Sequence, residues 1–128
     1  MVRFEIQGFR GEPEQITDVL GIKPDKAWKE GDPIGDWPIK KNHAFSCWRL
    51  ERSSDKLYDA GELLEHLLMK IDGLRNKVRS LPPSAEIMIY MFLKATPGES
   101  LPGVGLSEKT IELLADIGAA VDISIRTD

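Results

Sequence analysis

Residues 85–96 read Ala-Glu-Ile-Met-Ile-Tyr-Met-Phe-Leu-Lys-Ala-Thr, and they decide the fold that this sequence predicts. Prolines stand on both sides of the stretch and limit it to a length that is typical of a strand. The stretch is too short for a typical helix. Both faces of such a strand are apolar: one carries Ile87, Ile89, Met91 and Leu93, and the other carries Met88, Tyr90 and Phe92. A strand of this kind belongs inside a sheet, with cover on both faces.

Composition limits the class of protein. The chain has 128 residues, 41% of them hydrophobic and 30% charged, which is typical of one folded domain that needs no disulfide to hold its core. The single Cys47 fits a reducing compartment, and neither a signal-peptide pattern nor a membrane-spanning segment is present, so we expect a cytoplasmic protein without membrane contact. A net charge of −4 argues against nucleic acid as a partner.

Hydrophobic periodicity around residues 85–96 predicts the element order β-α-β-β-α-β-α-β. The other strands are expected at 2–8, 26–30, 44–52 and 121–127, and the helices at 13–20, 60–80 and 107–117. Whether Gly73 divides the helix at 60–80 is left open. The first six elements match a ferredoxin-like split βαβ core, which the last helix and strand would extend beyond residues 85–96. The sequence therefore predicts a single α+β domain over residues 1–128.

The open face of a ferredoxin-like sheet is the first candidate for an interface. Met88, Tyr90 and Phe92 would line this face. Because contiguous apolar surface usually marks association, we expect a homodimer or another protein partner at these three side chains.

The last predicted helix carries two different stripes. Its buried face is expected to consist of Ile111, Leu114 and Ala115, with Ile117 as a further candidate. Its exposed side carries Glu108, Glu112 and Asp116, whose spacing of four places them on one helix face. This acidic stripe is either a solvated surface, which we favour, or a surface that meets a basic partner.

The segment at 31–42 is the best candidate for a ligand or partner site. A loop of about twelve residues is long for a compact domain, and such loops often carry function. An aromatic pocket around Trp37 would take its polar groups from Asp32, Asp36, His43 and Arg49. In the competing interpretation, tryptophans pin the connection to the core. We favour that interpretation for Trp28 and Trp48 and leave it open for Trp37.

His43 and Cys47 are the one pair that suggests a nucleophile and a base. Four residues of a strand span about 13 Å, so the pair would need irregular geometry, and we expect Cys47 to be a core or interface residue. The sequence has no cysteine and histidine spacing of a metal site, and the glycines at 98–105 lack the lysine of a phosphate loop. The sequence predicts no catalytic residue, no metal and no cofactor.

Several short motifs together resemble a known family. They are Phe4-x-Ile6, Ile16-x-x-x-Leu20-Gly21-Ile22-x-Pro24, Trp48-Arg49-Leu50 and Leu114-Ala115-x-x-Gly118-Ala119-x-Val121-Asp122-Ile123. Along nearly the whole chain they resemble a bacterial family of small proteins known as domain of unknown function 4279. The chain departs from that pattern at Ile125-Arg126-Thr127, where an aromatic residue would be expected. The resemblance implies a stand-alone α+β domain with no established activity, and it transfers no catalytic residue.

Two hypotheses of function remain at the level of the sequence. The first is a non-enzymatic binding or interaction module, of which an immunity-type protein that captures a toxin is one example. The alternative is a small-molecule-binding or enzymatic domain that uses the loop around Trp37. Salt-sensitive binding of a basic protein would favour the first, and a ligand bound near Trp37, His43 and Arg49 would favour the second.

Overall fold

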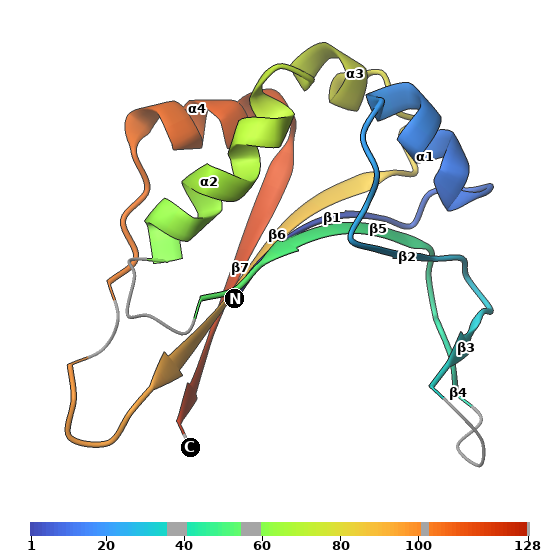
Figure 1. Cartoon of the computed structure of the whole chain (residues 1–128). Coiled ribbons are helices and arrows are strands. Elements are labelled where there is room, and N and C mark those ends of the chain that lie inside the picture. Colours follow the sequence, from blue (N-terminus) through green and yellow to red (C-terminus); the bar gives the residue numbers. More distant parts are fainter. Residues whose placement is uncertain (36–40, 55–59, 101–102, 128) are drawn as a thin grey trace.

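A mixed five-stranded sheet with helices on one face forms the framework of this α+β protein (Figure 1). The structure is a computed structural model that describes residues 1–35, 41–54, 60–100 and 103–127. The strand order is β2 (Lys26–Trp28), β5 (Cys47–Arg52), β1 (Val2–Gln7), β6 (Glu86–Ala95) and β7 (Ala119–Thr127). β1 is antiparallel to β5 and β6, β2 is antiparallel to β5, and β7 is parallel to β6.

The predicted strand at 85–96 is present as β6, with a neighbouring strand on each edge. It therefore lies inside the sheet, as predicted, although β1 and not β6 is the central one of the five strands. Cover on both faces by the chain itself is not found, because all the described helices lie on one side of the sheet in Figure 1, which leaves the other face open as expected for a ferredoxin-like sheet. We call that side the helix face and the opposite side the open face.

Among the described residues, four helices cover the helix face: α1 (Pro13–Leu20), α2 (Ala60–Asp72), α3 (Arg75–Arg79) and α4 (Glu108–Asp116). The predicted helix at 60–80 is thus divided, and the break falls at Gly73 and Leu74. In the described parts of the chain, no helix is long and apolar enough to cross a membrane. Between helices and sheet lies the core, whose fully buried members include Phe4, Ile6, Trp48, Leu50, Leu64, Leu67, Ile71, Ile89 and Met91.

The buried face of α4 differs from the predicted one. Leu114 and Ile117 are buried as predicted, and Leu113 is buried as well, whereas Ile111 is 53% exposed and Ala115 is exposed too. The stripe begins at Thr110, which is itself buried and donates its hydroxyl to Glu65 Oε1 at 3.2 Å. The prediction for Ile111 is wrong because a polar residue with a hydrogen-bond partner takes the first position of the i, i+3, i+4, i+7 stripe.

The acidic stripe of α4 finds its partners within the same chain. Arg75 of α3 lies 3.3 Å from Asp116 and 3.4 Å from Glu112, and Arg79 also pairs with Asp116. These exposed ion pairs contribute little to stability. They do pair two of its three carboxylates, Glu112 and Asp116, within the chain, which weakens the argument for a basic partner.

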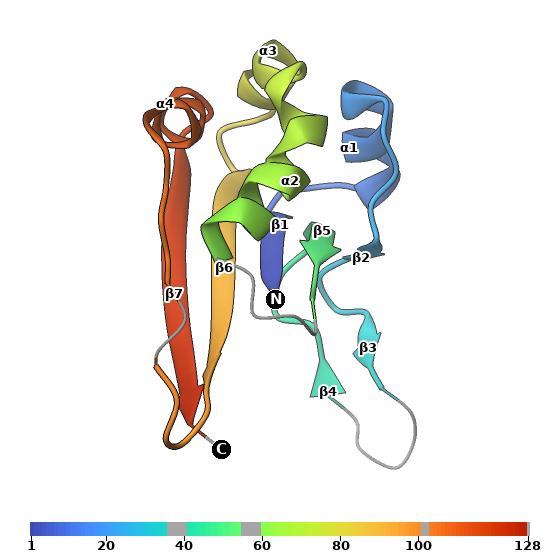
Figure 2. The same ribbon diagram turned by 60° about the vertical axis from the view of Figure 1, so that its left-hand side comes forward.

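The segment predicted as the loop 31–42 contains a short hairpin. β3 (Pro33–Ile34) and β4 (Lys41–Asn42) pair antiparallel and project away from the main sheet (Figure 2). The Gly31 amide donates to the His43 carbonyl at 2.9 Å, and the His43 amide donates to the Asp32 carbonyl at 2.8 Å. The prediction of an irregular loop is wrong at β3 and β4, because strands of two residues have no alternation to detect.

Candidate functional site

The open face of the sheet gathers aromatic rings and arginines. Strand pairing sets Glu5 opposite Arg49 on one side and opposite Met88 on the other, all on the face away from the buried Phe4. Because side chains alternate along strands, the same face carries the rest of what we call the open-face cluster. The cluster consists of Arg3, Glu5, Gln7, Trp28, Cys47, Arg49, Tyr90 and Phe92. The sheet bends away from the helices at both ends, so this face is concave (Figure 1).

Glu5 is the centre of the cluster. It is 3% exposed, and its Oε2 accepts a hydrogen bond from Arg49 Nε at 2.9 Å. Its Oε1 accepts from Gln7 Nε2 at 2.8 Å and from the Cys47 thiol at 3.2 Å. An ionised carboxylate withdrawn from water needs partners of this kind, because its desolvation is unfavourable by several kcal/mol. Glu5 thereby fixes the positions of three neighbours.

Trp28 joins two of the predicted site residues. The guanidinium carbon of Arg49 lies 4.7 Å from the centre of the Trp28 ring, a cation–π contact. His43 stacks on Trp28 with ring centroids 4.2 Å apart and an interplanar angle of 17°. The Trp28 indole nitrogen donates to the Phe45 carbonyl at 3.0 Å. His43 and Arg49 therefore do lie together, at the base of the β3–β4 hairpin.

The three predicted interface residues lie on the same open face. Tyr90 and Phe92 stack with centroids 6.1 Å apart, and the guanidinium carbon of Arg3 lies 4.8 Å from the centre of the Phe92 ring. The Tyr90 hydroxyl accepts a hydrogen bond from Gln7 Nε2 at 3.0 Å. Met88, Tyr90 and Phe92 are half-buried, because neighbouring side chains of their own sheet partly cover them.

A hollow of about 380 Å³ lies beside Phe92 at the edge of the cluster. Its lining includes the side chains of Arg3, Lys94 and Arg126 and the N-terminal residue Met1. Among the described residues, Arg3 Nε is buried without a hydrogen-bond partner. The positive charge of this hollow suits an acidic group of a ligand or partner.

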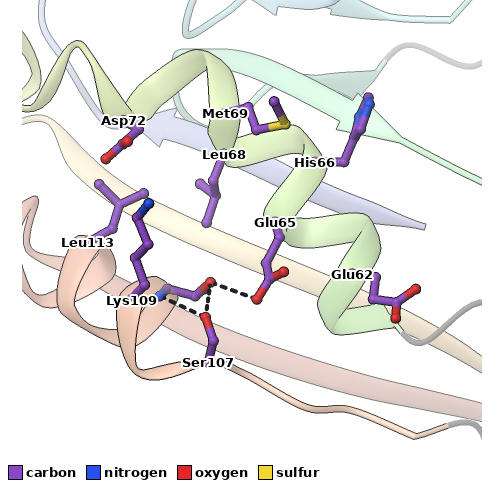
Figure 3. Close-up of a pocket in the computed structure, with 10 residues that line it drawn as sticks. Glu62, Glu65, His66, Leu68, Met69, Asp72, Ser107, Lys109 and Leu113 are labelled. Atoms are coloured by element: carbon purple, nitrogen blue, oxygen red, sulfur yellow. Dashed lines mark hydrogen bonds between the residues drawn. The ribbon is translucent and has the colours of Figure 1, made fainter.

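A second hollow, of about 420 Å³, lies between α2 and α4 (Figure 3). Hydrogen bonds connect Ser107, Thr110 and Glu65 across it, and His66 points away from this network. Thr110 and Ser107 fix the start of α4 there. Within the described ranges, no group of three histidine, cysteine, aspartate or glutamate residues could hold a metal ion. We assign this hollow a structural role.

The remaining predicted site residues divide into two groups. The Asp32 carboxylate accepts the Lys29 amide at 2.8 Å and closes a turn, and its carbonyl accepts the amide of His43, the residue that stacks on Trp28. Asp36 and Trp37 lie outside the described residues. Sequence reasoning did not select Arg3, Glu5 and Gln7, although the alternation of the strand 2–8 places all three away from the core. The pattern that could have identified them is this alternation, which places the three side chains on one face of the strand. The strand register that brings them to Arg49 and Tyr90 cannot be read from the sequence.

Cys47 is held in the neutral form. The thiol is fully buried, and burial, followed by the charge of Glu5 and the hydrogen bond to it, raises the pKa of Cys47 above its ordinary range. We expect the folded protein at pH 8 to react with iodoacetamide at least about a hundredfold more slowly than a free thiol, because the thiolate is the nucleophile. The urea-unfolded chain should react at the free rate, and equal rates for folded and unfolded protein would contradict this assignment.

The same shift predicts a loss of stability at alkaline pH. Above about pH 9 the unfolded chain releases the thiol proton while the folded protein retains it, so the unfolded state binds fewer protons and the free energy of unfolding falls. The fall due to Cys47 is at most about 1.4 kcal/mol per pH unit, the limit for one proton. Urea unfolding of Cys47→Ser at pH 8 and pH 10 should show a smaller fall than the wild type. An unchanged difference between the two pH values would show that Cys47 does not contribute.

The comparison with protein families covers the entire chain. The model of the family described as Domain of unknown function (DUF4279) matches residues 1–128. No match is found among curated proteins or among solved structures.

Proposed function

The chain belongs to the DUF4279 family, and on this premise we propose that it is a non-enzymatic binding module whose binding surface is the open face of its sheet. The open-face cluster supports this proposal. Tryptophan, tyrosine and arginine supply most of the binding energy at protein interfaces. Here Trp28, Tyr90 and Arg49 are held by contacts that centre on Glu5 and its partners, and Arg3 lies over the Phe92 ring. Groups that are ordered before association lose less conformational entropy on binding.

The chemistry of the open face favours an acidic and apolar partner segment. Arg3 and Arg49 lie over aromatic rings, and the hollow beside Phe92 adds further positive charge. Immunity-type capture of a protein remains within this proposal. Its contact surface would be the open face, since Glu112 and Asp116 of the acidic stripe of α4 are already paired with Arg75 and Arg79.

We propose the finer fold as well: a ferredoxin-like split βαβ core built from β1, α1, β2, β5, the α2–α3 pair and β6. The antiparallel pairing of β1 with β5 and β6, and of β2 with β5, supports it. α4 and β7 would be the extension. This fold carries many unrelated functions and does not choose among them. The cytoplasmic location and the homodimer remain predictions.

Selection from a displayed peptide library against the immobilised protein tests the binding proposal. We expect selected peptides to combine acidic with apolar residues. Their affinity should fall about tenfold or more in Trp28→Ala and in Phe92→Ala, as expected for anchor residues. Met69→Ala is the matched control, because Met69 is 73% exposed on α2, on the helix side of the sheet. Peptides whose binding is the same in all three variants would overturn the proposal.

The alternative, a small-molecule-binding or enzymatic domain around Trp37, has one favourable observation. The Trp28–His43 stack with Arg49 at the base of the hairpin is a geometry that accepts flat or anionic molecules. Native mass spectrometry of gently purified protein distinguishes the two. A retained small molecule that is lost in Trp28→Ala would favour the alternative.

A further inference from the structure

β7 is a long edge strand without the usual protection against pairing. It runs from Ala119 to Thr127 and lies last in the sheet, so within the described ranges no strand pairs with its outer edge. Natural edge strands carry proline, charged residues (lysine above all) or bulges against intermolecular pairing; β7 contains no proline or lysine, and its two charged residues, Asp122 and Arg126, have opposite signs. Its outer edge is therefore available to another strand.

The apolar side chains of β7 are more exposed than alternation predicts for a half-buried strand. Val121, Ile123 and Ile125 share the helix face, yet their exposed fractions are 38%, 46% and 54%. The half of β7 nearer the C-terminus extends beyond α2 and α4 (Figure 1). A second strand alongside would shield this apolar row from water.

Geometry restricts how β7 can pair with itself. Two copies related by a twofold axis have to run antiparallel along a shared edge. Along an antiparallel ladder, hydrogen-bonded positions alternate with non-hydrogen-bonded ones, and two residues directly opposite each other must be of the same kind. The axis therefore passes through a pair of identical residues.

Charge then selects one register. With the axis at Ser124, Asp122 of each copy stands opposite Arg126 of the other on the open face, and Ile123 stands opposite Ile125 on the helix face. Opposite charges directly across two strands stabilise the pair, and like charges destabilise it. With the axis at Ile123, Asp122 would instead face Ser124, and the charge complementarity would be lost.

We propose that two copies of the chain associate through the outer edges of β7, antiparallel about a twofold axis at Ser124. This inference rests on the homodimer predicted above and identifies the outer edge of β7 as the contact surface between the two copies. It moves the contact from Met88, Tyr90 and Phe92 to β7, and it joins the two sheets into one. Except for Arg126, which would pair with Asp122 of the other copy, the open-face residues of both copies stay free for the partner discussed under the proposed function.

A charge-reversal cycle tests the register. In 50 mM salt, sedimentation equilibrium should show the dimer Kd raised about tenfold or more by Asp122→Arg and by Arg126→Asp, because each change creates two like-charge pairs per dimer. The double variant Asp122→Arg/Arg126→Asp should return to within about threefold of the wild type. Asp18→Arg is the matched control, since it makes the same change at an exposed position of α1, which lies at the opposite end of the molecule from β7 (Figure 2).

Cross-linking gives an independent readout. Ser124→Cys should form an intermolecular disulfide on mild oxidation, since opposed residues of antiparallel strands have Cα atoms about 4.5–5.5 Å apart. Ala120→Cys should not, because its two copies would lie about 26 Å apart. A wild-type chain that stays monomeric at 100 micromolar overturns the homodimer and this inference together. A dimer that is unaffected by the charge reversals and is not cross-linked at Ser124 overturns only the β7 interface.

Discussion

Replacing Glu5 by alanine is expected to lower the free energy of unfolding by about 3–5 kcal/mol. The variant would leave the Arg49 side chain, which is only 12% exposed, without its carboxylate. It would also remove the acceptor of the Gln7 amide and the Cys47 thiol. Breaking a buried ion pair on one side is strongly destabilising because the remaining charge has no partner and little water. Urea unfolding followed by circular dichroism measures this loss.

Two further variants separate this network from an ordinary ion pair. Glu51→Ala removes the neighbouring Lys26–Glu51 pair of 3.2 Å, in which Lys26 is 59% exposed, and should lower stability by no more than about 1 kcal/mol. Glu5→Leu/Arg49→Leu removes both buried charges and should be less destabilising than the sum of its single variants. If Glu5→Ala were no worse than Glu51→Ala, the central role of Glu5 would be refuted.

The Glu5 network connects stability to the proposed function. Glu5 holds Arg49 by its Nε, and the same guanidinium lies over Trp28. Gln7 spans from Glu5 to the Tyr90 hydroxyl. A partner on the open face would therefore meet side chains that the fold has already positioned, and Glu5 acts as a positioning residue beneath them.

Local signals allowed much of the fold to be predicted. The alternation over 85–96 identifies β6. The end of α1 could be predicted from Gly21, which in the structure takes the positive φ of 75° that favours glycine and donates its amide to the Thr17 carbonyl. The start of α4 was readable because Ser107 accepts the Thr110 amide. Each of these signals lies within a few residues of the feature that it specifies.

The open-face cluster could not be predicted, for the opposite reason. Glu5 and Arg49 are separated by 44 positions, and Gln7 and Tyr90 by 83. Only the register of three strands brings these residues together, and register depends on packing across the whole sheet. The sequence marked His43, Arg49, Tyr90 and Phe92 as candidates but assigned them to two separate sites, a loop pocket and an interface.

Replacement of the buried tryptophan is the second change that we expect to lower stability strongly. Trp48→Ala is expected to lower the free energy of unfolding by about 3–5 kcal/mol, the range for removing a buried aromatic side chain. Trp48 is fully buried, packs edge-on against Phe4 at 6.4 Å, and donates its indole N–H to the Thr17 hydroxyl at 3.0 Å. It thus joins β5 to α1. Thr17→Val, which removes only the hydrogen bond, should destabilise by about 1 kcal/mol.

Trp28→Ala is the informative comparison, because the two residues lie on opposite faces of the paired strands β2 and β5. Ala27 stands opposite Trp48, which turns Trp28 to the open face. Trp28 is half-buried, and its ring contacts are with His43 and Arg49 rather than with the core, so its removal should lower stability by less than about 2 kcal/mol. Urea unfolding of both variants, together with peptide binding by Trp28→Ala, separates the two roles. Equal destabilisation with unchanged peptide binding would make Trp28 a second structural pin, as the sequence suggested. A small loss of stability with weakened binding would assign Trp28 to the binding surface.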